Sequence, residues 1–260
     1  MSSPDARVAD YDCIADRYDR RYDLYRYEGV RDALLTFLAP GTPAVLEVGC
    51  GTGHWLREVA GRATLVAGVD RSARMLERAR AAAPAARIVQ AAAEQLPWRD
   101  ESFDRVFCVN ALHHFADRQS FFVEARRILK PGGGLMTVGK DPHAARDEWW
   151  VYDYFEETRA IDLERFAPVR TLRGELTLAG FAWTESFEAD RIEVVRSAAD
   201  AFADGVIDRA FTSQLTVLSD DELRRGVDRI RSAEAERAAA GGRLDLVADF
   251  RLYATVGWTT

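Results

Sequence analysis

The sequence predicts an α/β fold in which a mainly parallel sheet is covered by helices on both faces. Three observations favour this fold class. Short apolar runs alternate with segments of helical periodicity from residue 44 to residue 139, and uninterrupted apolar runs are typical of parallel strands buried on both faces. The first run ends in a turn rich in glycine. The last predicted strand, residues 247–258, alternates in polarity and is therefore expected to be antiparallel.

The glycine turn follows the first apolar run and directly precedes a helical pattern. Gly49, Gly51 and Gly53 permit positive φ angles and a close approach of the backbone to a ligand. The next helix would present unpaired N–H groups to that ligand. A dinucleotide fingerprint would need a glycine where the chain has His54, and no phosphate-binding Gly-Lys-Ser/Thr motif occurs. Because Glu47 precedes the turn, a cationic ligand fits better than a phosphate.

Further motifs stand at the ends of later predicted strands. The second apolar run ends in Asp70, at about the spacing from a glycine turn at which an acid meets ribose hydroxyls. It is followed by Ala92-Ala93-Glu94, by the segment from Asp104 to Phe115, and by Leu129-Lys130-Pro131-Gly132-Gly133. In this order and spacing the set resembles the class I S-adenosylmethionine-dependent methyltransferases, most closely the small-molecule branch that includes quinone-biosynthesis methyltransferases. The likeness covers residues 11–136.

The resemblance implies a Rossmann-like, doubly wound fold and S-adenosyl-L-methionine as the cofactor. It also implies roles for particular residues: Glu47 and the Gly49–Gly53 backbone around the methionine portion, Asp70 at the ribose hydroxyls, Arg71 and Met75 against the adenine face, Ala93 and Glu94 at the adenine amino edge, Asn110 beside the methionine portion, and Tyr18 near the methyl-donor end. The physical interpretation of Asp70 agrees, because an acid at the end of a buried strand needs donors and a diol offers two. Met75 is equally compatible with a core position. Glu94 stands where the family often has Asp, so its contact stays open.

One domain is expected over residues 1–260. Within it, residues 1–40 are predicted to form an N-terminal helical cover and residues 41–140 the cofactor-binding core. Residues 141–170 are predicted to form a roof over the site, and residues 197–242 a helical insertion before the last strand.

Few catalytic side chains are required, because a sulfonium methyl donor is already activated and positioning supplies much of the acceleration. Adjacent His113 and His114 cannot both serve one metal centre, so no metal site is predicted. Histidine is a natural general base, and the candidates are His113 and His143. The predicted lining of the acceptor pocket consists of His143, Tyr18 and at least one aromatic residue of the roof, from Trp149, Trp150, Tyr152 and Tyr154. The alternative is that His143 caps the next helix and the roof aromatics belong to the core.

Composition excludes some classes of function. A formal net charge of −7 argues against a hold on a nucleic-acid backbone. No segment is apolar enough to span a bilayer and no leader pattern opens the chain, so a cytoplasmic protein without a membrane partner is expected. The sequence therefore predicts methyl transfer to a small molecule, with an apolar or aromatic body because the roof is aromatic. The alternatives are a cofactor-binding protein of the same fold without methyl transfer, and another transfer from the same cofactor, such as aminopropyl transfer. The oligomeric state and the methylated atom are not predicted.

Overall fold

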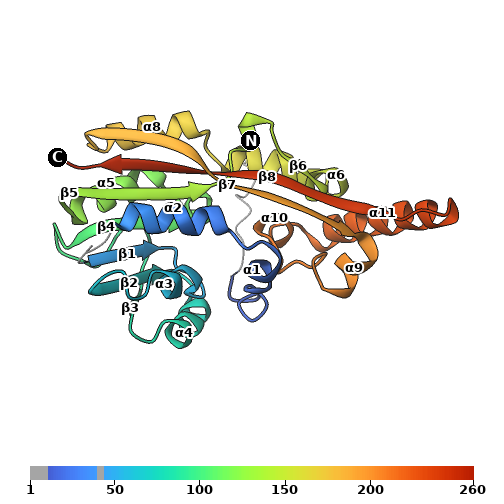
Figure 1. Ribbon diagram of the computed structural model, residues 1–260, viewed down its shortest axis with the longest axis horizontal. Coiled ribbons are helices and arrows are strands. Elements are labelled where there is room, and N and C mark those ends of the chain that lie inside the picture. Colours follow the sequence, from blue (N-terminus) through green and yellow to red (C-terminus); the bar gives the residue numbers. More distant parts are fainter. Residues whose placement is uncertain (1–10, 40–43) are drawn as a thin grey trace, which may run out of the picture.

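The computed structural model describes residues 11–39 and 44–260 (Figure 1). Its described strands form one mixed sheet in the order β3-β2-β1-β4-β5-β8-β6, with β7 paired to β8. The parallel part consists of β1 (Ala44–Val48), β2 (Leu65–Asp70), β3 (Arg87–Gln90), β4 (Phe103–Val109) and β5 (Leu129–Gly139). The last strand, β8 (Asp245–Trp258), runs antiparallel to β5, to β6 (Glu148–Trp149) and to β7 (Trp183–Ser197). The predicted fold class and the antiparallel last strand are confirmed.

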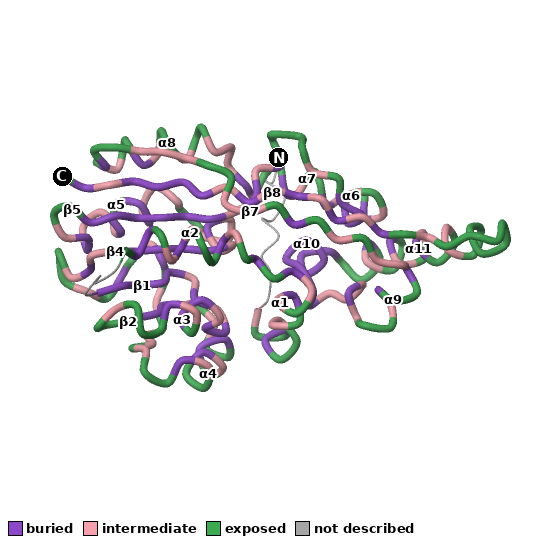
Figure 2. Tube along the Cα trace, viewed as in Figure 1, coloured by how far each residue is buried: buried purple, intermediate pink, exposed green. Residues whose placement is uncertain are grey.

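Helices cover both faces of the sheet because successive strand residues point to opposite sides. On one face, α2 (Glu28–Leu38) packs through Leu34 and Phe37 in a cluster that also contains Val45 of β1. On the other face, Leu46 belongs to a second cluster, which also contains residues of α5 (Arg118–Ile128) and α8 (Val169–Leu178). The helices α3 (His54–Glu58) and α4 (Ala73–Ala82) pack on β2 and on each other. Figure 2 shows the buried strands between these layers.

The N-terminal cover differs from its prediction. Apolar and aromatic residues at helical spacing over residues 11–22 predict a continuous amphipathic helix, but the described chain forms turns up to residue 19 and one short helix, α1 (Arg20–Leu24). The polar residues of this stretch contact the core domain. Thr52 Oγ1 donates to Asp19 Oδ1 over 2.5 Å, and Ser72 Oγ donates to Asp12. Tertiary contacts with the glycine turn and with the start of α4 thus override the helical periodicity.

The last two long strands reach beyond the carboxyl end of β5. The sequence after the helix-ending Gly180 predicts a strand over 182–190, but β7 stays paired with β8 from Trp183 to Ser197. β5 ends opposite Tyr253, so the remainder of β8 forms a platform past the parallel strands. Beside this platform lie η2 (Pro142–Ala144), α6 (Trp150–Tyr154), α7 (Glu157–Arg165), α9 (Ala198–Ala203), α10 (Ser213–Thr216) and α11 (Asp220–Ala239), most of which Figure 1 labels. This helical group therefore stands at the edge of the sheet where active-site groups collect.

The segment predicted as a helical insertion is helical only in part. Its three helices are separated by the loops at 204–212 and 217–219. Ser219-Asp220-Asp221-Glu222 has the sequence pattern of a capping box, and the box is present at the start of α11: the Ser219 side chain accepts from the Glu222 N–H, and the Glu222 side chain accepts from the Ser219 N–H. None of the helices within residues 11–39 and 44–260 has the length and apolar character needed to cross a membrane.

Candidate active site

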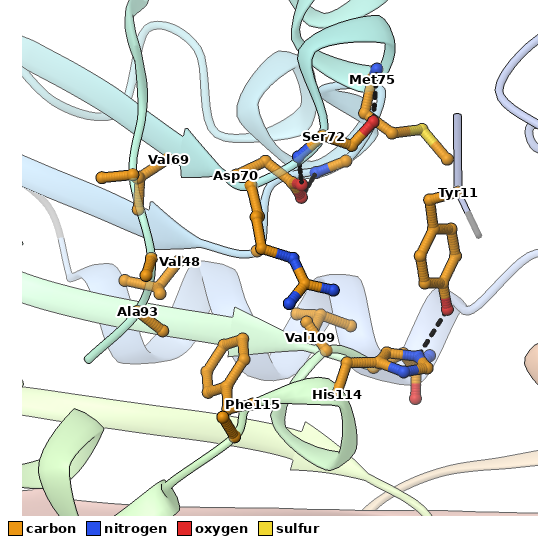
Figure 3. Close-up of a pocket in the computed structure, with 18 of the residues that line it drawn as sticks. Tyr11, Val48, Val69, Asp70, Ser72, Met75, Ala93, Val109, His114 and Phe115 are labelled. Carbon is orange, nitrogen blue, oxygen red and sulfur yellow. Dashed lines mark hydrogen bonds between the residues drawn. The ribbon is translucent and has the colours of Figure 1, made fainter. Parts of the chain in front are cut away.

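A cavity of about 570 Å³ lies at the carboxyl ends of β1, β2 and β4 (Figure 3). Its volume falls in the range of small-molecule sites. We call it the outer cavity, because a second, inner cavity adjoins it. Nine of the eleven residues predicted to bind the cofactor line the outer cavity: Tyr18, Gly49, Gly51, Asp70, Arg71, Met75, Ala93, Glu94 and Asn110. Glu47 and Gly53 do not line it.

The three glycines of the turn serve different purposes. All three have positive φ, at +74° for Gly49, +50° for Gly51 and +83° for Gly53. A Cβ on Gly49 would lie 2.4 Å from the Ala111 Cβ, and one on Gly53 would lie 3.0 Å from the Ala79 Cα. Packing thus requires glycine at these two positions. Gly51 instead faces the outer cavity, where its backbone is open to a ligand.

Asp70 is held rigidly at the end of β2. Its Oδ2 accepts from the Gly51 N–H and its Oδ1 from the Ser72 N–H, both over 2.9 Å. Burial raises the pKa of Asp70, and these backbone hydrogen bonds oppose the rise. A carboxylate has about four acceptor sites, so Asp70 retains capacity for the two hydroxyls of a ribose.

Glu47 is 1% exposed, and its Oε2 has no hydrogen-bond partner among the described residues. Burial raises the pKa of Glu47 well above its ordinary value, and the neighbouring charge of Asp70 raises it further. An orphaned buried acceptor of this kind fits a cationic group such as the ammonium of the methionine portion. Because Glu47 does not line the cavity, it would act from behind the glycine turn.

Glu94, predicted to contact the adenine amino edge, contacts the backbone of a neighbouring loop instead. Its Oε1 accepts from the Ala116 N–H over 2.7 Å and from the Asp117 N–H over 3.2 Å, which fixes the loop before α5. This oxygen therefore holds backbone where an adenine contact was predicted. Met75 was predicted either to contact the adenine or to lie in the core. It does line the outer cavity, and it is also buried, with 1% of its surface exposed, in a small apolar cluster with Ile14.

A second cavity, of about 40 Å³, shares part of its wall with the first and is lined by residues of α1, α10 and β8 and by residues that follow β4 and β5. The two cavities share Tyr11 and Asn110 in their walls. Asn110 follows β4 with a φ of +50°, and its N–H donates to the Val138 carbonyl over 2.8 Å. Buried aromatic residues line this inner cavity, among them Tyr25, Tyr27, Trp149, Phe211 and Phe250.

The two adjacent histidines serve different cavities. His113 lines the inner one, where its ring stacks on Phe166 at 4.0 Å and its Nε2 lies 3.4 Å from the Ser213 Oγ. Burial lowers the pKa of His113 well below its usual value, and His114 lowers it further, so the ring is neutral at neutral pH. In the outer cavity, the His114 Nε2 lies 2.5 Å from the Tyr11 hydroxyl (Figure 3).

His143 lies outside both cavities, contrary to its prediction. It is exposed, its N–H donates to Asp141 Oδ1, and its Nε2 contacts the Phe166 carbonyl over 2.8 Å. Asp141 thus caps the short turn η2, which directs the His143 side chain to the surface. His143 does not cap the next helix either, as the structural alternative had it, because α6 begins at Trp150 without a side-chain cap.

Only one of the four predicted roof aromatics, Trp149, lines the inner cavity. Trp150 is 3% exposed and packs against Phe155 in the core. The Tyr152 hydroxyl donates to Asp162 over 2.8 Å, and Tyr154 is a partly exposed residue of the same helix. Helix α6 begins at Trp150, so its 3.6-residue period places Trp150 and Tyr154 on one face and turns Tyr152 to another. Tyr18 lines the outer cavity and not the inner one.

The sequence-based prediction missed two cations of the inner wall, Arg21 and Lys140. Each carries a signal in the sequence. Arg21 stands three residues after Tyr18, at helical spacing among the aromatic residues of the cover, where a cation is unexpected. Lys140 directly follows β5, as Asn110 directly follows β4, at the edge of the sheet where ligands bind.

Fold and site together define an open α/β protein with a nucleoside-cofactor site that opens onto a second, aromatic cavity. Residues 46–137 match the family model of a methyltransferase domain. A demethylmenaquinone methyltransferase of Tropheryma whipplei is 39% identical over 95 residues, which cover 36% of this chain and 40% of the relative. A malonyl-[acyl-carrier protein] O-methyltransferase of Erwinia pyrifoliae is 29% identical over 198 residues, 74% of each chain. These likenesses bear out the resemblance to S-adenosylmethionine-dependent methyltransferases that the motifs predicted.

Solved structures share the fold. A candidate methyltransferase from an antibiotic biosynthesis pathway of Anabaena variabilis superimposes with a TM-score of 0.69 at 22% identity, covering 89% of this chain and 96% of its own. The [4+2]-cyclase SpnF superimposes with a TM-score of 0.53 at 20% identity, covering 88% and 80%. The chain spans about 40% of the length of the first curated relatives that it matches. The likeness to SpnF indicates that this fold alone does not determine the reaction.

Proposed function

We propose that the protein transfers the methyl group of S-adenosylmethionine to a small molecule bound at the inner cavity, whose walls would have to move apart because about 40 Å³ is below the volume of small-molecule sites. The observation that carries this proposal is the common wall of the two cavities at Tyr11 and Asn110. A donor in the outer cavity and an acceptor in the inner one would meet at this wall. The bound cofactor supplies a methyl carbon on a positively charged sulfur, which the nucleophile of the acceptor attacks as the carbon–sulfur bond breaks.

The residues of the chain would act mainly by position. Asp70 and the backbone at Gly51 hold the donor, and Asn110 is fixed at the meeting point by its hydrogen bond to Val138. The buried aromatic wall excludes water from the acceptor. Alignment of two reactants in this way is worth about 7–11 kcal/mol of a reaction barrier.

His113 is the proposed general base where the acceptor carries a proton to be lost. Its ring faces the inner cavity, and its lowered pKa keeps it unprotonated at neutral pH. The proton of the acceptor would pass to Nε2, the nitrogen near Ser213. His143 has no part in this proposal.

The substrate class follows from the walls of the inner cavity. Tyr25, Trp149, Phe211 and Phe250 offer aromatic surface, which supports an acceptor with an apolar or aromatic body. The names of the two methyltransferase relatives, one acting in menaquinone formation and one on a malonyl carrier protein, show that related chains serve different acceptors.

Two measurements test the proposal. Calorimetry should show binding of S-adenosylmethionine and of S-adenosylhomocysteine to the folded protein. Donor labelled in its methyl group should then transfer the label to a member of a panel of aromatic acceptors, with one S-adenosylhomocysteine formed per methyl group. Absence of binding of either cofactor form would contradict the proposal.

The alternative is a chain of the same fold that does not transfer the methyl group, since the fold is shared with a [4+2]-cyclase. The chain would then bind the cofactor without transferring its methyl group. This alternative predicts cofactor binding but no S-adenosylhomocysteine with any acceptor. Aminopropyl transfer is distinguished by its product, because it would release methylthioadenosine.

A further inference from the structure

Arg21 is a buried cation of the inner cavity without an anionic partner in the part of the chain that the structure describes. It is 8% exposed, and its Nε and Nη2 have no hydrogen-bond partner among the described residues. It also forms no ion pair with any described carboxylate. Its guanidinium lies over the Tyr18 ring, 3.8 Å from the centroid, a contact that offsets only part of the cost of burial. A buried charge left unpaired is strongly destabilising.

The other cations of this region do have acids nearby. Lys140 is 9% exposed, and its Nζ lies 3.6 Å from Asp147 and over the Trp149 ring. Asp162, which is fully buried, interacts electrostatically with both Lys140 and Arg165. Asp147 and Asp162 thus offset Lys140 and Arg165, and the charge of Arg21 remains uncompensated.

The free atoms of Arg21 have the geometry of a carboxylate site. Nε and Nη2 lie on the same edge of the planar guanidinium, so their N–H groups are parallel. This edge binds the two oxygens of a carboxylate at once. The side chain lines the inner cavity, so such a ligand would lie among its aromatic walls.

We propose that the methyl acceptor carries a carboxylate group that binds to the Nε and Nη2 edge of Arg21, with Lys140 as a second cation in the same cavity. The apolar body of the acceptor would then pack against Tyr25, Phe211 and Phe250. This inference rests on the proposed function, because it assigns the acceptor to the inner cavity. Arg21 would select acids from the uncharged molecules that the aromatic walls also accept.

The test compares matched pairs of probes in the full-length protein saturated with S-adenosylhomocysteine. The pairs are benzoate and benzamide, cinnamate and cinnamamide, and octanoate and octanamide. Calorimetry should show at least one carboxylate binding about tenfold or more tightly than its amide, as expected for a charged, bidentate hydrogen bond. In Arg21→Met that preference should fall to about onefold, and Lys140→Met should reduce it.

Arg20→Met is the matched control, because Arg20 belongs to the same short helix and is exposed. It should keep the full preference. Arg21→Lys retains the charge but lacks the planar fork, so it should bind the carboxylate less tightly even if Arg21→Met fails to fold. Equal affinity for all three acids and amides in the parent, or an unchanged preference in Arg21→Lys, would overturn the inference.

Binding of S-adenosylhomocysteine is measured first, to separate this inference from the function on which it rests. Failure of that binding in the parent contradicts the proposed function. Normal binding without any preference for carboxylates contradicts only the role assigned to Arg21.

Discussion

At the scale of single residues, the cofactor site depends on acceptors that the backbone holds in place. Asp70 illustrates this, because two backbone N–H groups fix its carboxylate at the end of β2. Asp70→Ala should weaken binding of S-adenosylhomocysteine by about 1.5–3 kcal/mol, the value of hydrogen bonds to a charged group. Calorimetry measures the loss. Asp228→Ala, a change at an exposed position of α11, is the control, and equal affinities in the two variants would remove Asp70 from the site.

Two residues predicted for the roof, Trp150 and His143, should differ in what their substitution changes. Trp150 is buried against Phe155, so Trp150→Ala should lower the free energy of unfolding by about 3–5 kcal/mol. His143 is exposed and lies outside both cavities, so His143→Ala should leave turnover and cofactor affinity unchanged. Thermal unfolding and methyl-transfer assays measure the two effects. A large loss of turnover in His143→Ala with normal stability would restore His143 as a catalytic residue.

At the scale of elements, two helical glycines offer a matched test of packing. A Cβ on Gly226 of α11 would lie 2.1 Å from the Phe155 ring, whereas one on Gly174 of α8 would meet nothing within 4 Å. Gly226→Ala should therefore destabilise the protein by about 1–3 kcal/mol through overpacking. Gly174→Ala should stabilise it by about 0.4–1 kcal/mol, because alanine restricts the unfolded chain.

Thermal unfolding of both variants tests this contrast directly. Gly226 of α11 packs against Phe155 at the end of α6, so the prediction also tests how these two helices pack beside the platform. A stabilising effect of Gly226→Ala would mean that α6 and α11 are not packed as described.

At the scale of the whole molecule, buried ionisable groups connect stability with pH. Burial lowers the pKa of His54 to about 4 and also lowers the pKa of His113 and His114. Below the unfolded value of about 6.5, the unfolded chain binds protons that the folded protein excludes. Stability from these histidines is therefore present above pH 6.5 and is lost as the pH falls through the folded pKa values.

Buried acids act in the opposite direction. Burial raises the pKa of Glu47 and Asp70, so the folded protein binds their protons first, and their burial becomes less costly as the pH falls. A difference measurement isolates one histidine. Between about pH 7 and pH 5, the melting temperature of the parent should fall more than that of His113→Asn. The variant lacks the imidazole of His113, which takes up a proton in the unfolded chain but not in the folded protein. Equal falls would show that His113 is protonated in the folded protein.

The sequence by itself determined the cofactor half of the protein. Local patterns sufficed there, because the glycine turn and Asp70 are adjacent to the strands that position them, and parallel strands bring their carboxyl ends to one edge. The same patterns predicted the alternation of helices and strands and the antiparallel β8. A strand buried on both faces is a continuous apolar run, whereas a strand buried on one face alternates between apolar and polar residues. The division of the chain into cover, core, roof and insertion remains a prediction.

Only the tertiary structure decided the inner cavity. Its walls come from α1, from residues after β4 and β5, from the loop before α10 and from β8, which are far apart in the chain. No local period records which side chains of such segments face one another. Trp149 therefore reaches the cavity while Trp150 enters the core, and His143 turns to the surface. The unpaired charge of Arg21 likewise became visible only when its neighbours were in place, because the lack of a partner is a property of packing and not of sequence.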